Sequence, residues 1–157
     1  MAVDRETAVK ISNQYSTFLL EIRKSAIDRK GVFAAQAIPA LRKVIEYAGE
    51  KIRFREGHRR YLRVLHSRDK KRIYLARLSR GWIIDGAVGG NGAELINHSC
   101  DPNLFIKREH GKLNLYSKRR IRRGDELTTD YRFPADSPRL RCRCGAANCR
   151  GTINLKK

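Results

Sequence analysis

The sequence has few acidic residues for its length. Its 157 residues contain 16 Asp and Glu against 35 Lys and Arg, which gives a formal net charge of +19. Residues 51–80 alone hold twelve Lys and Arg against two acids, and a second basic run begins at Lys107. Such a surface favours polyanions, namely nucleic acid, nucleoprotein or an acidic membrane face. The other interpretation is a solvated face that keeps the protein soluble.

Long apolar runs and targeting signals are also missing. No run of 18 apolar residues occurs, so no membrane span is expected. The first 25 residues lack the charged start, apolar middle and cleavage site of a secretory signal. We therefore expect a reducing, intracellular setting: the nucleus or chromatin in a eukaryote, or the cytoplasm or nucleoid in a bacterium. The length suits one domain, and the oligomeric state is not indicated.

Short apolar or alternating segments, bounded by Gly, Asp or Pro, predict a mostly β fold of several small sheets. The predicted strand segments are residues 16–26, 31–38, 44–52, 72–78, 81–88 and 113–121. Residues 55–69 differ, because Tyr61, Leu62 and Leu65 recur at helical spacing and predict one short helix. We expect a polar lead-in over 1–14, with a helix as one interpretation, and a domain over 15–133 that contains the basic insert 51–80. Residues 134–157 would form a linker and tail.

The four cysteines point to a metal site. Cys142, Cys144 and Cys149 form a C-x-C-x4-C pattern in the tail, and Cys100 lies in the domain. Two cysteines separated by one residue cannot easily bond to each other, because their Cβ atoms point to opposite faces of an extended chain. Four thiolates complete a structural zinc site with none left over, and such a site would hold down a short tail. The alternatives are unlinked thiols or a disulfide pair.

The stretch "ELINHSCDPNL", residues 94–104, places an amide, an imidazole, a hydroxyl and a thiol in a row before Asp101-Pro102. A zinc ligand at Cys100 would fix the tail directly beside Asn97 and His98.

Five segments in order resemble the SET-domain protein-lysine methyltransferases with a post-SET zinc tail. They are "KGVFAAQAI", "VIEYAGE", "ELINHSCDPNL", "IRRGDELTTDY" and "CRCGAANCRGTI". The resemblance covers nearly everything from residue 25 to residue 153. It implies a β-clip fold in which the Asn-His and Asp-Tyr segments cross in a pseudoknot-like arrangement near the C-terminus. It also implies methyl transfer from S-adenosylmethionine to a lysine of a histone, nucleoid or ribosomal protein.

The resemblance implies roles for particular residues, each with a structural alternative. Tyr131 would be the catalytic tyrosine, or else an edge aromatic, and Tyr47 would line the lysine channel, or else be a buried strand residue. Cofactor contacts are implied for Asn97, His98, Tyr74 and Phe133, and for Arg29, Lys30 and Gly31 of the first turn. His98 also has a structural interpretation within the crossing segments. Ile153 or Leu155 could join Phe133 over the adenine.

The sequence departs from the family at three positions. Arg29 stands where relatives carry the first glycine of a G-x-G turn, and we expect it to fit only with an ordinary φ. Glu94 replaces a basic residue, and a swapped Arg29–Glu94 charge pair is one interpretation. Thr129 replaces Phe or Tyr two residues before the catalytic tyrosine, which predicts room for more than one methyl group.

Two hypotheses therefore stand at this point. The first is an active lysine methyltransferase that meets its substrate on nucleic acid or on a nucleosome, because a chain of net charge +19 repels a free basic tail. The second is a non-catalytic nucleic-acid or chromatin-binding module on a SET scaffold. Cofactor binding in the micromolar range would discriminate between them.

Overall fold

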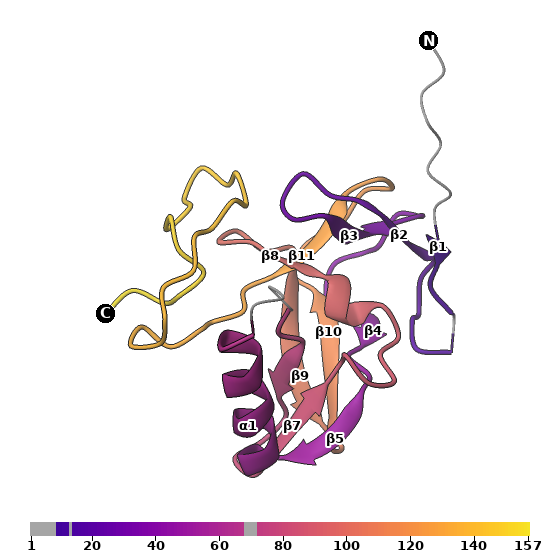
Figure 1. The fold of residues 1–157 in the computed structure, drawn as a ribbon. Helices are drawn as coiled ribbons and strands as arrows, with labels where there is room; N and C mark the ends of the chain where they lie inside the picture. Colours follow the sequence, from indigo (N-terminus) through magenta and orange to yellow (C-terminus); the bar gives the residue numbers. More distant parts are fainter. Residues whose placement is uncertain (1–8, 13, 68–71) are drawn as a thin grey trace.

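The computed structural model describes residues 9–12, 14–67 and 72–157 (Figure 1). Within these residues the chain forms short strands, one α-helix and one 3-10 turn. The elements are β1 (Val9–Lys10), β2 (Leu20–Lys24), β3 (Lys30–Ala34), β4 (Lys43–Glu46), β5 (Glu50–Arg53), α1 (Phe54–Leu65), β6 (Leu75–Arg77), β7 (Trp82–Asp85), η1 (Ala93–Leu95), β8 (Asn97–His98), β9 (Leu104–Glu109), β10 (Lys112–Ser117) and β11 (Glu126–Thr129). The predicted mostly β fold with one helix is confirmed.

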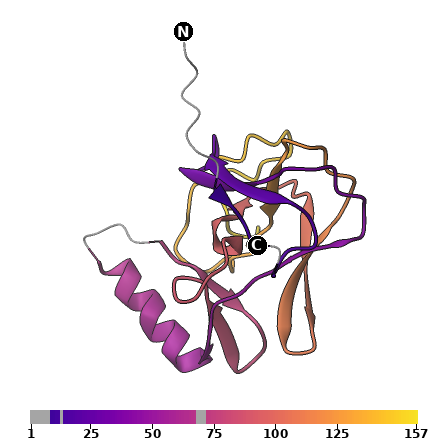
Figure 2. The same ribbon diagram turned by 90° about the vertical axis from the view of Figure 1, so that its right-hand side faces the viewer.

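The strands form three small sheets. Their orders are β1-β2-β3-β11-β8, β4-β10-β9 and β5-β7-β6. In the view of Figure 2 the β5-β7-β6 sheet lies between α1 and the β9–β10 hairpin. The C-terminal tail runs beside β8, on the side of the molecule away from β1 (Figure 1).

Several predicted boundaries were wrong. The segment 44–52 was expected as one strand, but it contains β4 and β5, which belong to different sheets. Strand pairing decides this: β4 pairs with β10, whereas β5 pairs with β7. The helical interpretation of the lead-in is wrong for Val9–Lys10, which pairs with β2. Residues 1–8 and 13 lie outside the described residues.

The β9–β10 hairpin, of which only β10 was predicted, turns at His110-Gly111. Both residues have positive φ, +51° and +71°, as a type I′ turn requires. The hairpin contributes side chains to two apolar clusters. The main core gathers buried residues of β2, β3, β4, β10 and β11, including Leu20, Val32 and Leu127. A smaller cluster packs Leu78 and Ile84 against Leu113 of β10.

The largest consequence for the site is the parallel pairing of β8 with β11. Thr128 lies opposite Asn97 and Thr129 opposite His98. This pairing brings together the two segments that were expected to cross. Asn103 secures β11 from another side, because its Oδ1 accepts a hydrogen bond from Thr128 N (2.9 Å) and its Nδ2 donates to Glu126 O (2.8 Å).

Replacement of Asn103 by Ala should lower the free energy of unfolding by about 2–3 kcal/mol, because it leaves buried backbone groups of β11 without partners. Denaturant unfolding followed by circular dichroism measures the change. Asp136→Ala, at an exposed position of the tail, is the control and should change stability by less than about 0.5 kcal/mol. A loss for Asn103→Ala no greater than that of the control would contradict this role.

Candidate active site and cysteine cluster

Asn97 is the centre of a buried polar cluster. Its side-chain nitrogen lies 2.8 Å from Glu126 Oε1, 3.1 Å from Ser25 Oγ and 3.0 Å from the carbonyl oxygen of Lys30. Ser25 Oγ in turn donates to Glu126 (2.8 Å). The amide nitrogen therefore holds the 25–31 turn against β11. Sequence reasoning missed Ser25 and Glu126, because only the β3–β11 register brings them beside Asn97.

Gly31 is required by this cluster. A Cβ at residue 31 would lie 2.2 Å from Glu126 Oε1 and 3.1 Å from Asn97 Nδ2. Such a contact would displace the carboxylate that holds Ser25. Packing against Glu126 therefore requires glycine at residue 31, in addition to the predicted contact of its backbone with a cofactor.

Arg29 differs from the expectation. Its φ is +39°, in the left-handed region, rather than ordinary. The turn imposes this conformation, because Ser25 N donates to Arg29 O (3.0 Å) and closes the loop before β3. Among the described residues, no ion pair joins Arg29 to Glu94, and the Glu94 carboxylate accepts instead from Gly92 N (2.8 Å).

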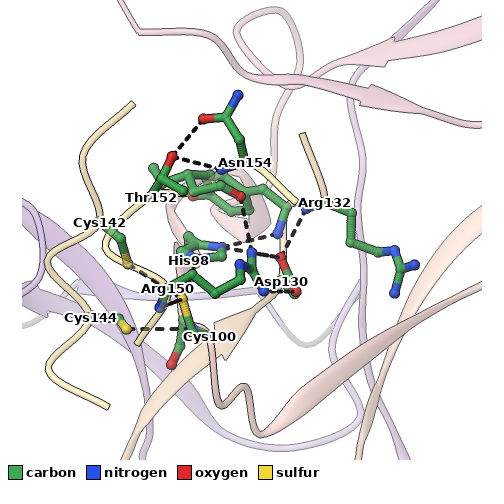
Figure 3. Close-up of polar contacts among 12 residues, drawn as sticks. His98, Cys100, Asp130, Arg132, Cys142, Cys144, Arg150, Thr152 and Asn154 are labelled. Atoms are coloured by element: carbon green, nitrogen blue, oxygen red, sulfur yellow. Dashed lines mark hydrogen bonds and ion pairs between the residues drawn. The ribbon is translucent and has the colours of Figure 1, made fainter. Parts of the chain in front are cut away.

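His98 has a defined tautomer. The backbone N–H of Tyr131 donates to its Nδ1 (3.2 Å), so Nδ1 carries a lone pair and the ring proton lies on Nε2. Nε2 lies 3.5 Å from Cys100 Sγ. Burial lowers the pKa of His98, despite the nearby Asp130 carboxylate that raises it, and favours the neutral ring. His98 thus joins the sulfur of Cys100 to the backbone of Tyr131. Figure 3 shows His98 close to Cys100 and Asp130.

Tyr131 lies where two cavities meet. Its hydroxyl donates to the carbonyl of Ile96 (2.8 Å), and its ring packs edge-on against His98 and tilted against Phe133. Tyr131 lines both a cavity of about 810 Å³ and one of about 250 Å³. Burial raises the pKa of Tyr131, and Asp28 raises it further, so the phenol stays protonated at neutral pH.

The larger cavity is mainly apolar and aromatic. It is lined by Tyr47, Tyr74, Thr129 and Phe133, and by apolar residues of β9 and β10. The hydroxyl of Tyr47 donates to the carbonyl of Tyr74 (2.7 Å). Burial, followed by the charge of Glu94, raises the pKa of Tyr47, so this hydroxyl is also neutral.

The smaller cavity lies between the 25–31 turn and the tail. Its lining includes Asn97, His98, Cys142 and Ile153. From the turn it takes Ile27 and Asp28, rather than the predicted Arg29, Lys30 and Gly31. Asp28 is held in place by an ion pair with Arg72. Ile153 of the tail lines this cavity, whereas Phe133, which was expected beside it, lines the larger cavity.

The four cysteines gather as predicted. The sulfurs of Cys100, Cys142, Cys144 and Cys149 all lie within 4.8 Å of one another, and no disulfide joins them. The cluster could hold a metal ion. Burial alone would raise the pKa of Cys144, but hydrogen bonds from the backbone N–H groups of Cys100 and Ala146 lower it to about 6. Burial and the neighbouring thiols raise the pKa of Cys142 to about 12. Four thiolates at this spacing would repel one another unless a cation lay between them.

Comparison with known proteins identifies the family. The SET-domain family model matches residues 29–132. The chain belongs to the SET-domain family. The chain is 37% identical over 147 residues to human histone-lysine N-methyltransferase SETD1B, and 40% identical over 144 residues to SETD1 of Drosophila melanogaster. Each match covers 86% of this chain but only 7% and 8% of those relatives, so the chain spans less than a tenth of their length.

Solved SET structures confirm the predicted fold. KRYPTONITE in complex with mCHH DNA, H3(1-15) peptide and SAH superposes with a TM-score of 0.72 at 30% identity. The superposition covers 88% of this chain and 30% of that chain. KRYPTONITE with mCHG DNA and SAH gives a TM-score of 0.73. The small sheets, the crossing segments and the cysteine-clustered tail therefore belong to a SET fold.

The left-handed Arg29 gives a stability prediction. Glycine adopts this conformation without the Cβ clash that costs other residues about 1–2 kcal/mol. Arg29→Gly should therefore be more stable than Arg29→Ala by about 1 kcal/mol, since Ala keeps the clash and removes the same side chain. Thermal unfolding of the two variants beside the wild type measures the difference. Equal stability of the Gly and Ala variants would show that the turn carries no strain.

Proposed function

We propose that the chain is a protein-lysine N-methyltransferase that uses S-adenosylmethionine. The observation that carries this proposal is the position of Tyr131 on the lining of both cavities. Relatives named histone-lysine N-methyltransferase, and a neighbour in complex with SAH and an H3 peptide, support the same chemistry.

The smaller cavity would hold the methyl donor and the larger one the substrate lysine. Of the residues proposed for the donor, Asn97 and His98 line this smaller cavity. Tyr74 and Phe133 line the larger cavity, and Arg29, Lys30 and Gly31 line neither, so these five would contact only a donor that reaches beyond the smaller cavity. When bound, the donor supplies an electrophilic methyl carbon on a sulfonium, whose S–C bond breaks as the lysine N–C bond forms. Asn97 contributes by fixing the 25–31 turn, because its amide nitrogen is committed to that turn rather than to a ligand.

Tyr131 would orient the lysine amine. Its proton is engaged with the carbonyl of Ile96, so its oxygen can accept a hydrogen bond from the amine. Because the phenol is neutral, Tyr131 acts by positioning and by its dipole rather than as a base. Tyr47 and the apolar wall exclude water from the lysine, which lowers the pKa of its amine and yields the uncharged nucleophile. Thr129 leaves space there for an amine that already carries a methyl group.

Zinc is the metal that we propose for the cysteine cluster. Four thiolates at a Zn–S distance of about 2.3 Å lie about 3.8 Å apart in a tetrahedron. Cys100 Sγ and Cys142 Sγ are 3.8 Å apart, which matches that spacing, and all four sulfurs lie within 4.8 Å of one another. In this proposal residues 15–133 form the SET domain, with its basic insert at 51–80, and residues 134–157 form the linker and post-SET tail.

The proposed substrate is a lysine of a histone or of another basic protein carried on DNA, at chromatin or at a nucleoid. Three exposed arginines of α1, Arg55, Arg59 and Arg63, recur every four residues and so share one face of the helix. This face is suited to phosphate contacts. No helix among the described residues is long and apolar enough to cross a membrane.

Tyr131→Phe should reduce methyl transfer by about 10²-fold or more, because the hydroxyl that orients the amine is lost. The ring contacts with His98 and Phe133 remain, so cofactor affinity and metal content should be preserved. The assay follows radiolabelled methyl transfer to nucleosomes, free histones and a cell lysate.

Tyr116→Phe is the matched control for this assay. Its hydroxyl donates to Glu109 (2.5 Å), and Tyr116 lines neither cavity. It should keep wild-type activity. Equal activity of Tyr131→Phe and wild type would contradict the catalytic role of Tyr131. Absence of label from every substrate would favour the non-catalytic module. A dead scaffold should also fail to bind S-adenosylmethionine in the micromolar range.

Nucleosomes should be methylated faster than free histone tails at low salt, because phosphates screen the repulsion between two basic partners. The advantage should shrink steeply between about 50 mM and 200 mM salt as counterions compete for the phosphate contacts. Arg55→Ala/Arg63→Ala should reduce the advantage without changing activity on a free peptide. A rate on nucleosomes equal to that on peptide at low salt would contradict DNA-assisted docking.

A further inference from the structure

Arg150 connects the cysteine cluster to the segment that carries Tyr131. Its backbone N–H donates to Cys100 Sγ (3.4 Å). Its guanidinium donates twice to Asp130, from Nη1 to Oδ2 at 2.8 Å and from Nη2 to Oδ1 at 2.9 Å. Nη2 also donates to the carbonyl of Ile153 (3.1 Å), which lines the smaller cavity. In Figure 3 the Arg150 side chain crosses from the sulfurs to Asp130.

Asp130 directly precedes Tyr131 and closes a tight turn. Its Oδ1 accepts from the backbone N–H of Arg132 (3.0 Å) and lies 3.5 Å from His98 Nδ1. Arg132 has a φ of +52°, in the left-handed region. A non-glycine residue keeps such a conformation only where its surroundings impose it. The side chain of Arg132 points away from the cluster in Figure 3, whereas its backbone N–H is held by Asp130 Oδ1.

Two routes therefore run from Cys100 to Tyr131. One passes through His98, whose ring lies between Cys100 Sγ and the backbone N–H of Tyr131. The other passes through Arg150 and Asp130. The ion pair is partly shielded, with 16% and 20% of the two side chains exposed, and its bidentate geometry fixes orientation as well as distance.

We propose that the Arg150–Asp130 pair is a positioning device that makes the orientation of Tyr131 depend on the occupied cysteine site. Only the expected effect of the pair on kcat rests on the function proposed above. Metal binding fixes Cys100 and Cys149, and with them the backbone of Arg150. Arg150 then holds Asp130, which imposes the turn at Arg132 and directs the Tyr131 hydroxyl toward the Ile96 carbonyl.

The first test replaces the pair while leaving all four cysteines in place. Arg150→Ala and Asp130→Asn should retain wild-type metal content and a cooperative thermal transition. Each should lower kcat by about ten-fold or more, through misorientation of Tyr131, while KM for the protein substrate changes less than about two-fold. The double variant should be no worse than the more affected single variant, because both act through one contact. Multiplicative losses, or a kcat within two-fold of wild type, would overturn the proposal.

Arg139→Ala is the control for loss of an exposed tail arginine. It should leave kcat and metal content unchanged. A loss in this control equal to that in Arg150→Ala would assign the effect to general tail charge and would overturn the role of the pair.

The second test needs no activity. With ring-labelled tyrosine, the Tyr131 signal among the six tyrosines is assigned by its absence from Tyr131→Phe. Arg150→Ala should shift this signal, and removal of the metal by a chelator should shift it in the same direction in the wild type. Chelation should then add little in Arg150→Ala. A Tyr131 signal that is unchanged by metal removal would overturn the coupling, even if methyl transfer itself were never observed. Absent methyl transfer with the expected shifts would instead overturn only the proposed function.

Discussion

The parallel contact between β8 and β11 joins two segments that are far apart in the sequence. It has only two pairs, Thr128 with Asn97 and Thr129 with His98. So short a contact cannot hold itself, because a pair of two-residue strands gains little from its own hydrogen bonds. Three sets of contacts hold it. The Asn97–Ser25–Glu126 cluster lies on one side, and the Asn103 side chain binds the backbone of β11. In the third, Cys100 N donates to Cys144 Sγ of the tail. These supports hold the two segments that carry Asn97, His98 and Thr129.

The same supports explain why the site contains strain. Arg29 and Arg132 both have left-handed φ values. Arg29 lies two residues before Gly31, and Arg132 directly follows Tyr131. Each strained residue is next to a polar group that closes its turn: Ser25 N–H binds the carbonyl of Arg29, and Asp130 binds the N–H of Arg132. Rigid turns of this kind keep the walls of both cavities fixed before any ligand enters, which lowers the cost of ordering them on binding.

Much of the fold and site could be predicted from the sequence. The β content, the helix, the cysteine cluster and the family follow from periodicity, from the count of thiols and from five ordered motifs. Strand partners could not be predicted, because residues 44–52 read as one alternating strand segment, although β4 and β5 pair with different sheets. The roles of Ser25, Glu126 and Arg150 also depend on contacts across the fold. Asn97 was identified, but its amide serves the turn, and a motif alone does not distinguish ligand contact from support.

The departures from the family motifs bear on whether the scaffold is catalytic. Arg29 is accommodated by a turn that tolerates its φ, and it does not line the smaller cavity. Glu94 lines the larger cavity, but its carboxylate accepts a hydrogen bond from Gly92 N–H. The charge of Glu94 raises the pKa of Tyr47. Neither residue therefore blocks the point where the cavities meet. At that point the Tyr131 hydroxyl is oriented by its hydrogen bond to the Ile96 carbonyl, and the Tyr131 backbone N–H is held by His98 Nδ1. This favours the enzyme over the inert module.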